Sequence, residues 1–383
     1  RGVSAILDKL LKGQKVEWLP LNEIVLPTKN IKWKDVDSIY QYIDLTSVDR
    51  KTNAIIETSL IDKENAPSRA QKIVEHNDII FATTRPTQMR IAVITEELHE
   101  QIASTGYCIL RADIKIVLPK WIYYNLSSVP FKNYLEENES GSAYPAISDT
   151  KLKEFKIPIP PLDVQAEIVR ILDAFTAVTA ELTAELNMRE KQYQYYRDKL
   201  LTFSDNEIIW KSLGDVCSLG VGQAPTSNEE GKFIFMNAGT TPASYLSIYN
   251  TEGDTITTPS RGQGGIGFVA YQNDKFWCGP LCYRIKSIDK SVMTKYLYYY
   301  LSKNSMQIIA LANMVGVPAL NRKELITLKL PIPPLDEQKR IVNILDKFEA
   351  LTHSIAEGLP KEITLRKQQY EYYREQLIDF PKN

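Results

Sequence analysis

The chain has 383 residues, of which 44% are hydrophobic and 24% are charged, and its formal net charge is −1. This balance is ordinary for globular proteins, and the length suits two domains rather than one small domain. No apolar run approaches the roughly 18 residues needed to span a bilayer, and no signal peptide opens the chain. We therefore expect a cytoplasmic protein that makes no membrane contact. The near-zero net charge neither supports nor excludes a nucleic-acid ligand, because phosphate binding needs only a local basic strip.

The four cysteines are Cys108, Cys217, Cys278 and Cys282. They are too few to form a disulfide framework at this length. Cys278 and Cys282 are close in sequence, but none of the three histidines lies near them. We expect buried free thiols there rather than a metal site.

A large internal repeat decides the predicted architecture. Residues 158–175 recur as residues 331–348, and both copies begin Pro-Ile-Pro-Pro-Leu-Asp-x-Gln. Further on, a Tyr-x-Tyr-Tyr-Arg sequence at 193–197 recurs at 370–374. Fainter upstream matches pair Pro145-Ala-Ile with Pro318-Ala-Leu, residues 123–126 with 298–301, Asp78 with Asp254, and Arg85 with Arg261. The chain is thus predicted to be a tandem duplication of a variable globular part followed by a near-constant part.

The near-constant parts are predicted to be long helices, which Asp163 and Asp336 can cap. The first runs from Asp163 to Leu201, and at about 1.5 Å per residue its 39 residues reach roughly 58 Å. Apolar residues recur at steps of three and four in both copies, as a coiled-coil seam requires. In the first copy they are Ile168, Leu172, Phe175, Thr179, Leu182, Leu186, Tyr193, Tyr196 and Leu200. In the second they are Ile341, Leu345, Phe348, Ile355, Ile363, Tyr370, Tyr373 and Leu377. We expect the copies to pair as an antiparallel coiled coil, although a core helix of a globular domain would show the same stripe.

Two departures from the simple repeat are also expected. The second helix contains Gly358-Leu-Pro360, which predicts a kink or break. At the N-terminus, residues 8–11 before Trp18 resemble residues 198–201 before Trp210. A short first helix should therefore pack beside the C-terminal helix and complete a pseudo-twofold molecule.

The globular parts are expected to be mixed α and β, which makes the fold class α+β. Strands are predicted at residues 79–82, 90–94, 232–236 and 266–270. The predicted segments are an N-terminal helix at 1–13, a first globular domain at 14–157, a first spacer helix at 158–203, a second globular domain at 204–330 and a second spacer helix at 331–383.

The tandem arrangement resembles the specificity subunits of type I restriction-modification systems. Two variable target-recognition domains, each followed by a helix beginning Pro-Ile-Pro-Pro-Leu-Asp-x-Gln, cover essentially the whole chain. The resemblance implies that each domain reads one half of a bipartite, asymmetric double-stranded DNA site, while the helices fix the gap between the halves. It also implies that the helices dock modification (methyltransferase) subunits, of which we expect two, and that restriction subunits join through the complex.

The same resemblance implies that no catalysis and no cofactor reside in this chain, since S-adenosylmethionine would bind the modification subunit. Two alternatives stay open. A self-contained methyltransferase or nuclease is disfavoured because no Asn-Pro-Pro-Tyr-like motif and no Gly-x4-Gly-Lys-Ser/Thr loop occur. A two-headed protein-interaction scaffold on a coiled coil would fit the same pattern of helices.

The candidate DNA-reading residues lie on polar loops, where arginine, asparagine, glutamine, serine and threonine can contact bases or phosphates. The two arginines Arg85 and Arg261 are treated as matched positions that could donate to guanine or grip a phosphate. A second pair of loops, at residues 141–144 and 316–317, precedes the long helices. The full set is Thr84, Arg85, Gln88, Arg90, Ser142, Tyr144, Ser260, Arg261, Gln263 and Asn321. Each could equally be a solvated loop residue.

Two further patterns are interpreted structurally. Residues 262–267 fit the Gly-x-Gly-x-x-Gly dinucleotide fingerprint, but that fingerprint needs a helix behind it, and the following residues predict a strand. The tyrosine pairs at 195–196 and 372–373 could stack on bases. They fall on the helical seam, so we expect them to pack the helices together.

Overall fold

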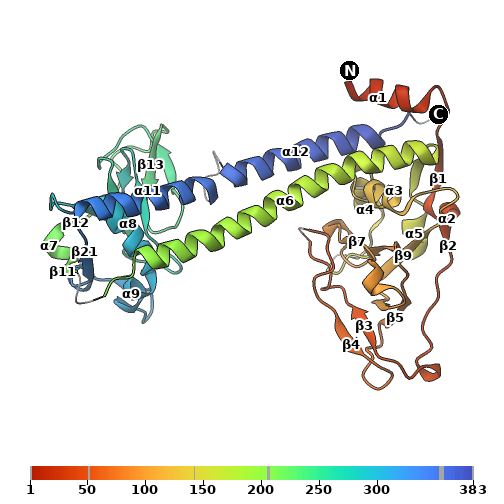
Figure 1. The fold of residues 1–383 in the computed structure, drawn as a ribbon, viewed down its shortest axis with the longest axis horizontal. Coiled ribbons are helices and arrows are strands. Elements are labelled where there is room, and N and C mark those ends of the chain that lie inside the picture. Colours follow the sequence, from red (N-terminus) through yellow and green to blue (C-terminus); the bar gives the residue numbers. More distant parts are fainter. Residues whose placement is uncertain (1, 51, 142, 205–207, 353–357, 382–383) are drawn as a thin grey trace. The chain divides into compact units, whose positions relative to one another are not determined.

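The computed structural model describes residues 2–50, 52–141, 143–204, 208–352 and 358–381. The chain divides into two compact units, one formed by Arg1–Glu181 with Ile363–Asn383 and the other by Leu182–Glu362. Each unit therefore holds one globular part together with portions of the long helices (Figure 1). The predicted division into five segments, with boundaries at the helix ends, stays a prediction.

The first unit contains two four-stranded sheets and a two-stranded ribbon. One sheet has the order β2 (Val25–Leu26), β9 (Tyr107–Ala112), β6 (Ile79–Ala82) and β7 (Ile91–Val93). The other has the order β4 (Ser59–Ile61), β3 (Tyr40–Ile43), β8 (Ile102–Ser104) and β5 (Ala70–Ile73). The ribbon pairs β1 (Glu17–Pro20) with β10 (Lys156–Ile159). The helices of its globular part are α1 (Gly2–Leu11), α2 (Leu21–Ile24), α3 (Pro119–Leu126), α4 (Val129–Asn138) and α5 (Asp149–Lys153), with 3-10 turns η1 (Trp33–Asp35), η2 (Pro86–Gln88) and η3 (Glu96–Leu98).

The second unit repeats this topology. Its four-stranded sheet has the order β12 (Cys217–Val221), β18 (Cys282–Ser287), β15 (Thr255–Pro259) and β16 (Ala270–Gln272). Its second sheet has the order β14 (Ser244–Leu246), β13 (Phe233–Met236) and β17 (Trp277–Cys278), and an isolated bridge between Thr251 and Phe276 takes the place of the β5 pairing. The ribbon pairs β11 (Ile209–Ser212) with β21 (Lys329–Ile332), and β19 (Ala312–Asn313) pairs with β20 (Ala319–Leu320). Its short helices are α7 (Leu213–Val216), α8 (Thr294–Lys303), α9 (Ser305–Ala310) and α10 (Arg322–Leu325). The matching strand orders confirm the predicted tandem duplication.

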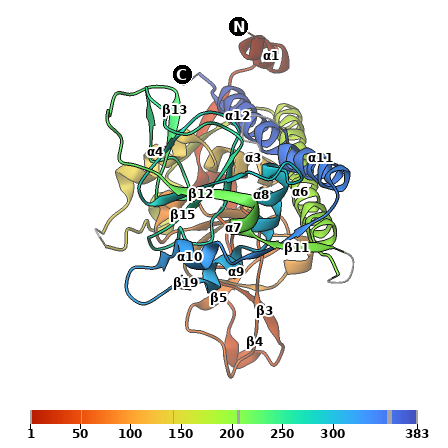
Figure 2. The same cartoon turned by 90° about the vertical axis from the view of Figure 1, so that its left-hand side faces the viewer.

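The long helices are α6 (Leu162–Leu200), α11 (Leu335–Thr352) and α12 (Gly358–Ile378). Helix α6 has 39 residues, as predicted. In the first unit the Phe175 ring of α6 stacks on Tyr373 of α12, with centroids 5.3 Å apart. In the second unit Tyr196 stacks on Phe348 of α11 at 5.5 Å, and these helices lie side by side in Figures 1 and 2. Residue numbers rise on α6 as they fall on its partners, so the pairing is antiparallel, as predicted.

The apolar stripe forms this seam. Ile168, Leu172 and Tyr193 are buried on α6, and Ile341, Leu345, Ile363 and Leu377 are buried on α11 and α12. The predicted seam residue Ile355 lies outside the described residues. The predicted break at Gly358-Leu-Pro360 falls at the start of a separate helix: α11 ends at Thr352, and α12 begins at Gly358 with a φ of +71°.

The predicted aspartate caps are wrong. Helix α6 begins at Leu162 and α11 at Leu335, so Asp163 and Asp336 lie in the first helical turn. The cap positions belong to Pro161 and its counterpart Pro334, whose carbonyl oxygens accept the first helical hydrogen bonds. The two carboxylates instead lie where they interact favourably with the positive end of the helix dipole.

A buried glutamine fixes each globular part to its helix. The Gln165 amide donates to the carbonyls of Ile116 (3.1 Å) and Pro160 (2.8 Å), and its oxygen accepts from Leu118 N (2.9 Å). Gln338 repeats these three bonds with Ser291, Pro333 and Met293, each at 2.8 Å.

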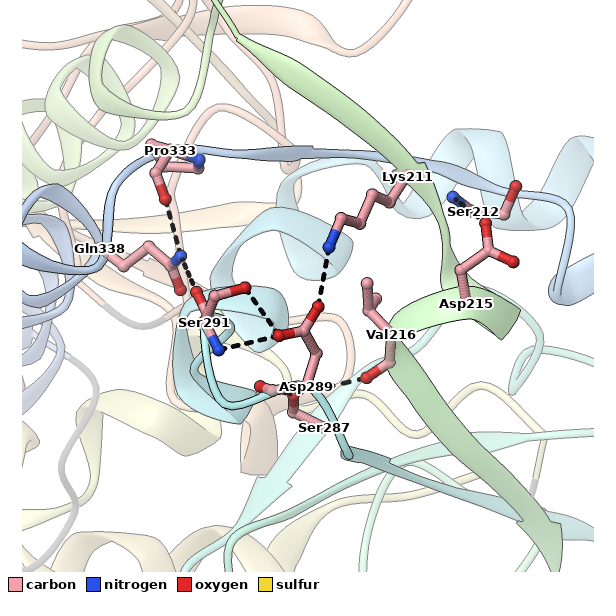
Figure 3. A network of polar contacts seen from close by, with 9 residues as sticks. All are labelled: Lys211, Ser212, Asp215, Val216, Ser287, Asp289, Ser291, Pro333 and Gln338. Carbon is pink, nitrogen blue, oxygen red and sulfur yellow. Dashed lines mark hydrogen bonds and ion pairs between the residues drawn. The ribbon is translucent and has the colours of Figure 1, made fainter.

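In the second unit a further ion pair extends this contact (Figure 3). Asp289 accepts from Lys211 Nζ at 2.8 Å and from the backbone and hydroxyl of Ser291. The hydrogen bond from Lys211 holds the pKa of Asp289 well below its usual range. The loop before α8 is thereby bonded both to β11 and to α11.

A pair of matched polar contacts lies about two turns further along each helix. In the first unit Asp173 of α6 accepts from Tyr124 Oη at 2.5 Å and pairs with Lys120 at 2.6 Å. In the second unit Asp346 of α11 accepts from Tyr299 Oη at 2.5 Å and pairs with Lys295 at 2.9 Å. The repeat therefore preserves the attachment of the globular part to the helix, whereas the loops differ.

The N-terminal helix lies in the first unit. Leu7 of α1 belongs to the same apolar cluster as Leu377 and Ile378 at the end of α12. Trp18 Nε1 also donates to the carbonyl of Pro381. These contacts support the predicted packing of the N-terminal segment beside the C-terminal helix.

Three of the four predicted strands are present, and the prediction at 266–270 is wrong. Residues 260–269 form a turn, and β16 begins only at Ala270. Gly262, Gly264 and Gly267 all have positive φ, which β-strands do not accommodate. All four cysteines are buried and free, and none of the described helices is long and apolar enough to cross a bilayer.

Candidate nucleic-acid interface

In the first unit a tight turn connects β6 to β7 and carries four of the candidate residues. Residues 83–90 include the short helix η2, and Arg85 and Met89 flank it with φ of +51° and +54°. The left-handed region costs a non-glycine residue roughly 1–2 kcal/mol, so the surrounding structure must impose it. The Arg85 N–H donates to the carbonyl of Pro145 at 2.7 Å, which fixes this conformation.

That bond joins the turn to the second candidate loop, about 60 residues further along the chain. Thr84 forms an isolated β-bridge with Ala146, and Ile147 N donates to Thr83 O at 2.9 Å. The Arg85 guanidinium lies over the Tyr144 ring, 5.3 Å from its centroid. Both side chains are exposed. The structure thus brings together the two loops that the sequence indicated separately.

The second unit builds the same junction. Arg261 forms a β-bridge with Ala319, Gly262 N donates to Pro318 O at 3.1 Å, and Leu320 N donates to Ser260 O at 2.9 Å. Burial raises the pKa of Tyr283, whereas a backbone hydrogen bond at Arg322 and the positive charges of Arg261 and Arg322 oppose that rise. The Tyr283 hydroxyl donates to Leu320 O at 2.8 Å.

These hydrogen bonds correct the sequence pairing of the two units by one residue. Arg85 corresponds to Gly262, because the Arg85 N–H donates to Pro145 O and the Gly262 N–H donates to Pro318 O. Thr84 corresponds to Arg261, because Thr84 bridges Ala146 and Arg261 bridges Ala319. Strand pairing agrees, since Ile79 opposite Leu110 corresponds to Ile256 opposite Ile285. By the same shift Asp78 corresponds to Thr255, not to Asp254. The two arginines are therefore not equivalent.

Charge on both junctions favours an anionic ligand. Residues 83–90 and 140–147 contain two arginines and no Asp or Glu. Residues 255–268 and 311–323 contain two arginines and one lysine, again without a carboxylate. A chain of net charge −1 can thus present two local basic surfaces, which is all that phosphate binding requires.

The individual candidates differ in their freedom to contact a ligand. Arg85, Tyr144, Arg261, Gln263 and Asn321 are exposed, and Asn321 precedes α10. Thr84 and Gln88 are half-buried within the turn. Ser260 is only 8% exposed and serves the junction through its backbone. Ser142 lies outside the described residues.

Arg90 has a structural partner. Its Nη1 donates to the carbonyl of Leu45 at 2.6 Å, so it anchors a loop that the sequence interpretation missed. This third loop follows β3, and exposes Thr46 and Arg50. Its counterpart after β13 contacts the glycine-rich turn, since a Cβ on Gly265 would lie 2.3 Å from Ala238 O. Nothing in their short polar sequences distinguishes these loops from ordinary surface loops.

Two other sequence interpretations can be compared with the structure. The glycine-rich turn at 262–267 leads into strand β16, so the helix that a dinucleotide fingerprint requires does not follow it. Among the paired tyrosines, Tyr196 and Tyr373 pack across the seam as predicted. Tyr195 and Tyr372 are each 59% exposed, so their predicted packing is wrong: they directly precede the seam residues and point off the seam.

Comparison with known proteins identifies the family. The family model described as type I restriction modification DNA specificity domain matches residues 23–189 and again residues 207–365. The chain belongs to this family. As expected of a type I specificity subunit, it is 35% identical to a type I restriction enzyme specificity subunit from Escherichia coli. The match covers 98% of this chain and 97% of that relative.

Solved structures agree with this assignment. A chain from a structure of type I restriction-modification complex assembly matches with a TM-score of 0.61 at 25% identity, covering 95% of this specificity subunit and 98% of that chain. The type I S subunit from M. genitalium matches with a TM-score of 0.64, covering 97% and 98% of the two chains. At 18% identity, the latter shows the shared fold alone. Both loop junctions of this specificity subunit lie inside the two segments that match the DNA specificity domain.

Proposed function

We propose that each unit of this specificity subunit reads one half of a bipartite, asymmetric double-stranded DNA site through its loop junction. The observation that carries the proposal is the repeated junction itself. In each unit, two distant loops are joined backbone to backbone and carry at least one exposed arginine with no carboxylate among them. Such a surface can bind phosphates and also present side chains to base edges. The one-residue shift between units, with arginine at different positions, gives them different recognition chemistry.

We further propose that the chain acts without a catalytic centre of its own. Methyl transfer would be performed by modification subunits, two per complex, that bind S-adenosylmethionine and dock on the long helices, with restriction subunits joining through the assembly. The helices α6, α11 and α12 would set the unspecified gap between half-sites. Because its proposed target is cellular or invading DNA, we infer a cytoplasmic location.

Arg85→Gly tests the junction of the first unit. Glycine adopts the left-handed conformation without cost, so this variant removes the guanidinium while the turn keeps its shape. The variant would be assembled with its modification subunit and tested on duplexes that each carry one changed base pair. If Arg85 reads a base, we expect ~5–150-fold weaker binding and relaxed specificity at one position of one half-site.

Arg170→Ala is the matched control. Arg170 is an exposed arginine on α6 that pairs with Glu167 and lies outside both junctions, so its loss should leave specificity unchanged. A uniform loss across all sequences for Arg85→Gly would make Arg85 a phosphate contact. Unchanged binding and specificity for Arg85→Gly would contradict the proposed junction. Methyl transfer by the isolated chain with S-adenosylmethionine and DNA would contradict its non-catalytic role.

A further inference from the structure

A short hairpin of the second unit ends in an exposed apolar tip. Strands β19 and β20 pair Ala312 with Leu320 and Asn313 with Ala319, which leaves residues 314–318 at the turn. Met314 is 57% exposed, Val315 is 87% exposed and Val317 is 69% exposed. Gly316 between them has a φ of +74° and open space around it. Three apolar side chains within four residues therefore face solvent.

This tip is held in a defined conformation. Val315 N donates to the Asn313 side-chain oxygen at 3.0 Å, which closes the turn. At the base of the hairpin, Ala319 bridges Arg261 and Pro318 O accepts from Gly262 N. The apolar tip is thus attached to the basic junction of the second unit.

The charges around the tip indicate what covers it. Arg261, Arg322 and Lys323 are exposed near the base of the hairpin, and the flanking segments lack carboxylates up to Lys323. Cations beside apolar side chains fit a ligand that presents apolar groups between phosphates. In duplex DNA the thymine C5-methyl is the apolar group displayed in the major groove, and that groove admits a two-stranded ribbon.

We propose that the tip formed by Met314, Val315 and Val317 packs on a thymine methyl group in the half-site read by the second unit. This inference rests on the proposed function and names one chemical feature of the DNA that it recognises. The half-site of the second unit must then contain at least one A·T pair whose thymine methyl is contacted.

The described residues of the first unit build this place differently. In the corresponding loop, Ser140 and Ala146 form an isolated bridge rather than paired strands. The exposed aromatic ring there, Tyr144, is covered on one face by the Arg85 guanidinium. The same place in the fold therefore presents an arginine–tyrosine pair in one unit and a bare aliphatic tip in the other, so dependence on thymine methyl groups should differ between the half-sites.

Replacement of thymine by deoxyuridine provides the test, since it removes the methyl group and leaves the base pairing intact. The specificity subunit, assembled with its modification subunit, would be titrated with duplexes carrying one such replacement at a time. We expect ~3–10-fold weaker binding at one or more positions of the second half-site, the effect of burying one methyl group.

Two tip variants complete the design. Val315→Thr with Val317→Thr keeps the shape of the tip, and Met314→Ser with Val315→Ser and Val317→Ser removes its apolar surface. Both should bind unmodified DNA more weakly, the double threonine variant should respond less to deoxyuridine in the second half-site, and the triple serine variant should lose that response. Any response in the first half-site should be the same in wild type and variants, which serves as the control.

Several results would overturn the inference. They are a second half-site without an A·T pair, an absence of any methyl effect there, or a methyl effect that persists in the triple serine variant. A triple variant that no longer assembles with the modification subunit would assign the tip to a protein contact instead. Binding of the wild-type complex with no sequence preference would contradict the proposed function itself, which separates the two failures.

Discussion

Gln165→Leu removes the buried contact that fixes the first globular part to α6. The Gln165 side chain is fully buried and bonds three backbone groups, those of Ile116, Leu118 and Pro160. Leucine has similar volume but bonds none of them, and each buried group left without a partner costs about 1–3 kcal/mol. Some of this loss is offset by the added apolar burial, so we expect the free energy of unfolding to fall by about 2–4 kcal/mol.

Urea denaturation of the full chain measures this loss. Gln194→Leu is the control, because Gln194 is an exposed residue of the same helix and its replacement should change stability by less than about 0.5 kcal/mol. Gln338→Leu should repeat the loss in the second unit, where the three bonds are the same. If Gln165→Leu unfolds at the same urea concentration as Gln194→Leu, the glutamine does not hold the helix and the reasoning is refuted.

Three further predictions concern the core, the seam and the spacing. Burial raises the pKa of Cys108 and Cys217 to about 12, so both thiols should stay protonated and unreactive toward a thiol-specific disulfide reagent at pH 8 until the protein unfolds; rapid labelling of either of these two thiols in the native chain would contradict this. Because the pKa values of Cys108 and Cys217 in the folded chain exceed the ordinary value of about 8.5, the two buried neutral thiols favour the folded state below that pH. This stabilisation is lost as the pH rises toward 12. Tyr196→Ala removes a ring stacked on its partner helix and should destabilise the chain by about 1–2 kcal/mol in thermal unfolding, whereas the exposed Tyr195→Ala should cost less than about 0.5 kcal/mol, and equal losses would mean that the seam is misplaced. Insertion of four residues, about one helical turn, after Ala184 of α6 should change the number of base pairs between the half-sites in methylation mapping, and an unchanged gap would show that the helices do not set it.

The repeat and the helical period predicted the architecture well, because each of these two patterns extends over many residues. A stripe of apolar positions over 39 residues still predicts the pairing when one member, such as Tyr196, is 41% exposed. The helix starts were less predictable, since an aspartate two residues after a proline pair can either cap the helix or lie within its first turn. In the structure the Pro161 carbonyl accepts the first helical hydrogen bond, from Gln165 N, so Asp163 lies within the first turn. The sequence alone does not reveal that bond.

The site was predictable in part. The polar turn at 83–90 and the loop around Tyr144 were each found from composition, but their contact depends on backbone hydrogen bonds between residues some 60 positions apart. The alignment failed by one residue because Arg85 and Arg261 look alike in sequence. Backbone conformation reveals the true match, Arg85 with Gly262, since both have positive φ. The loop after β3 carries no distinctive pattern, and its part in the site follows only from the bond between Arg90 and Leu45.

The measurement that bears most directly on the account is an exchange of one recognition unit. Residues 204–330 would be replaced by the corresponding part of another member of the family, and methylated sites would be mapped in cells that carry the complete system. Independent units predict that one half-site changes to that of the donor while the other half-site and the gap between them stay the same. A change in both half-sites, or in neither, would contradict the claim that each unit reads its own half of the DNA site.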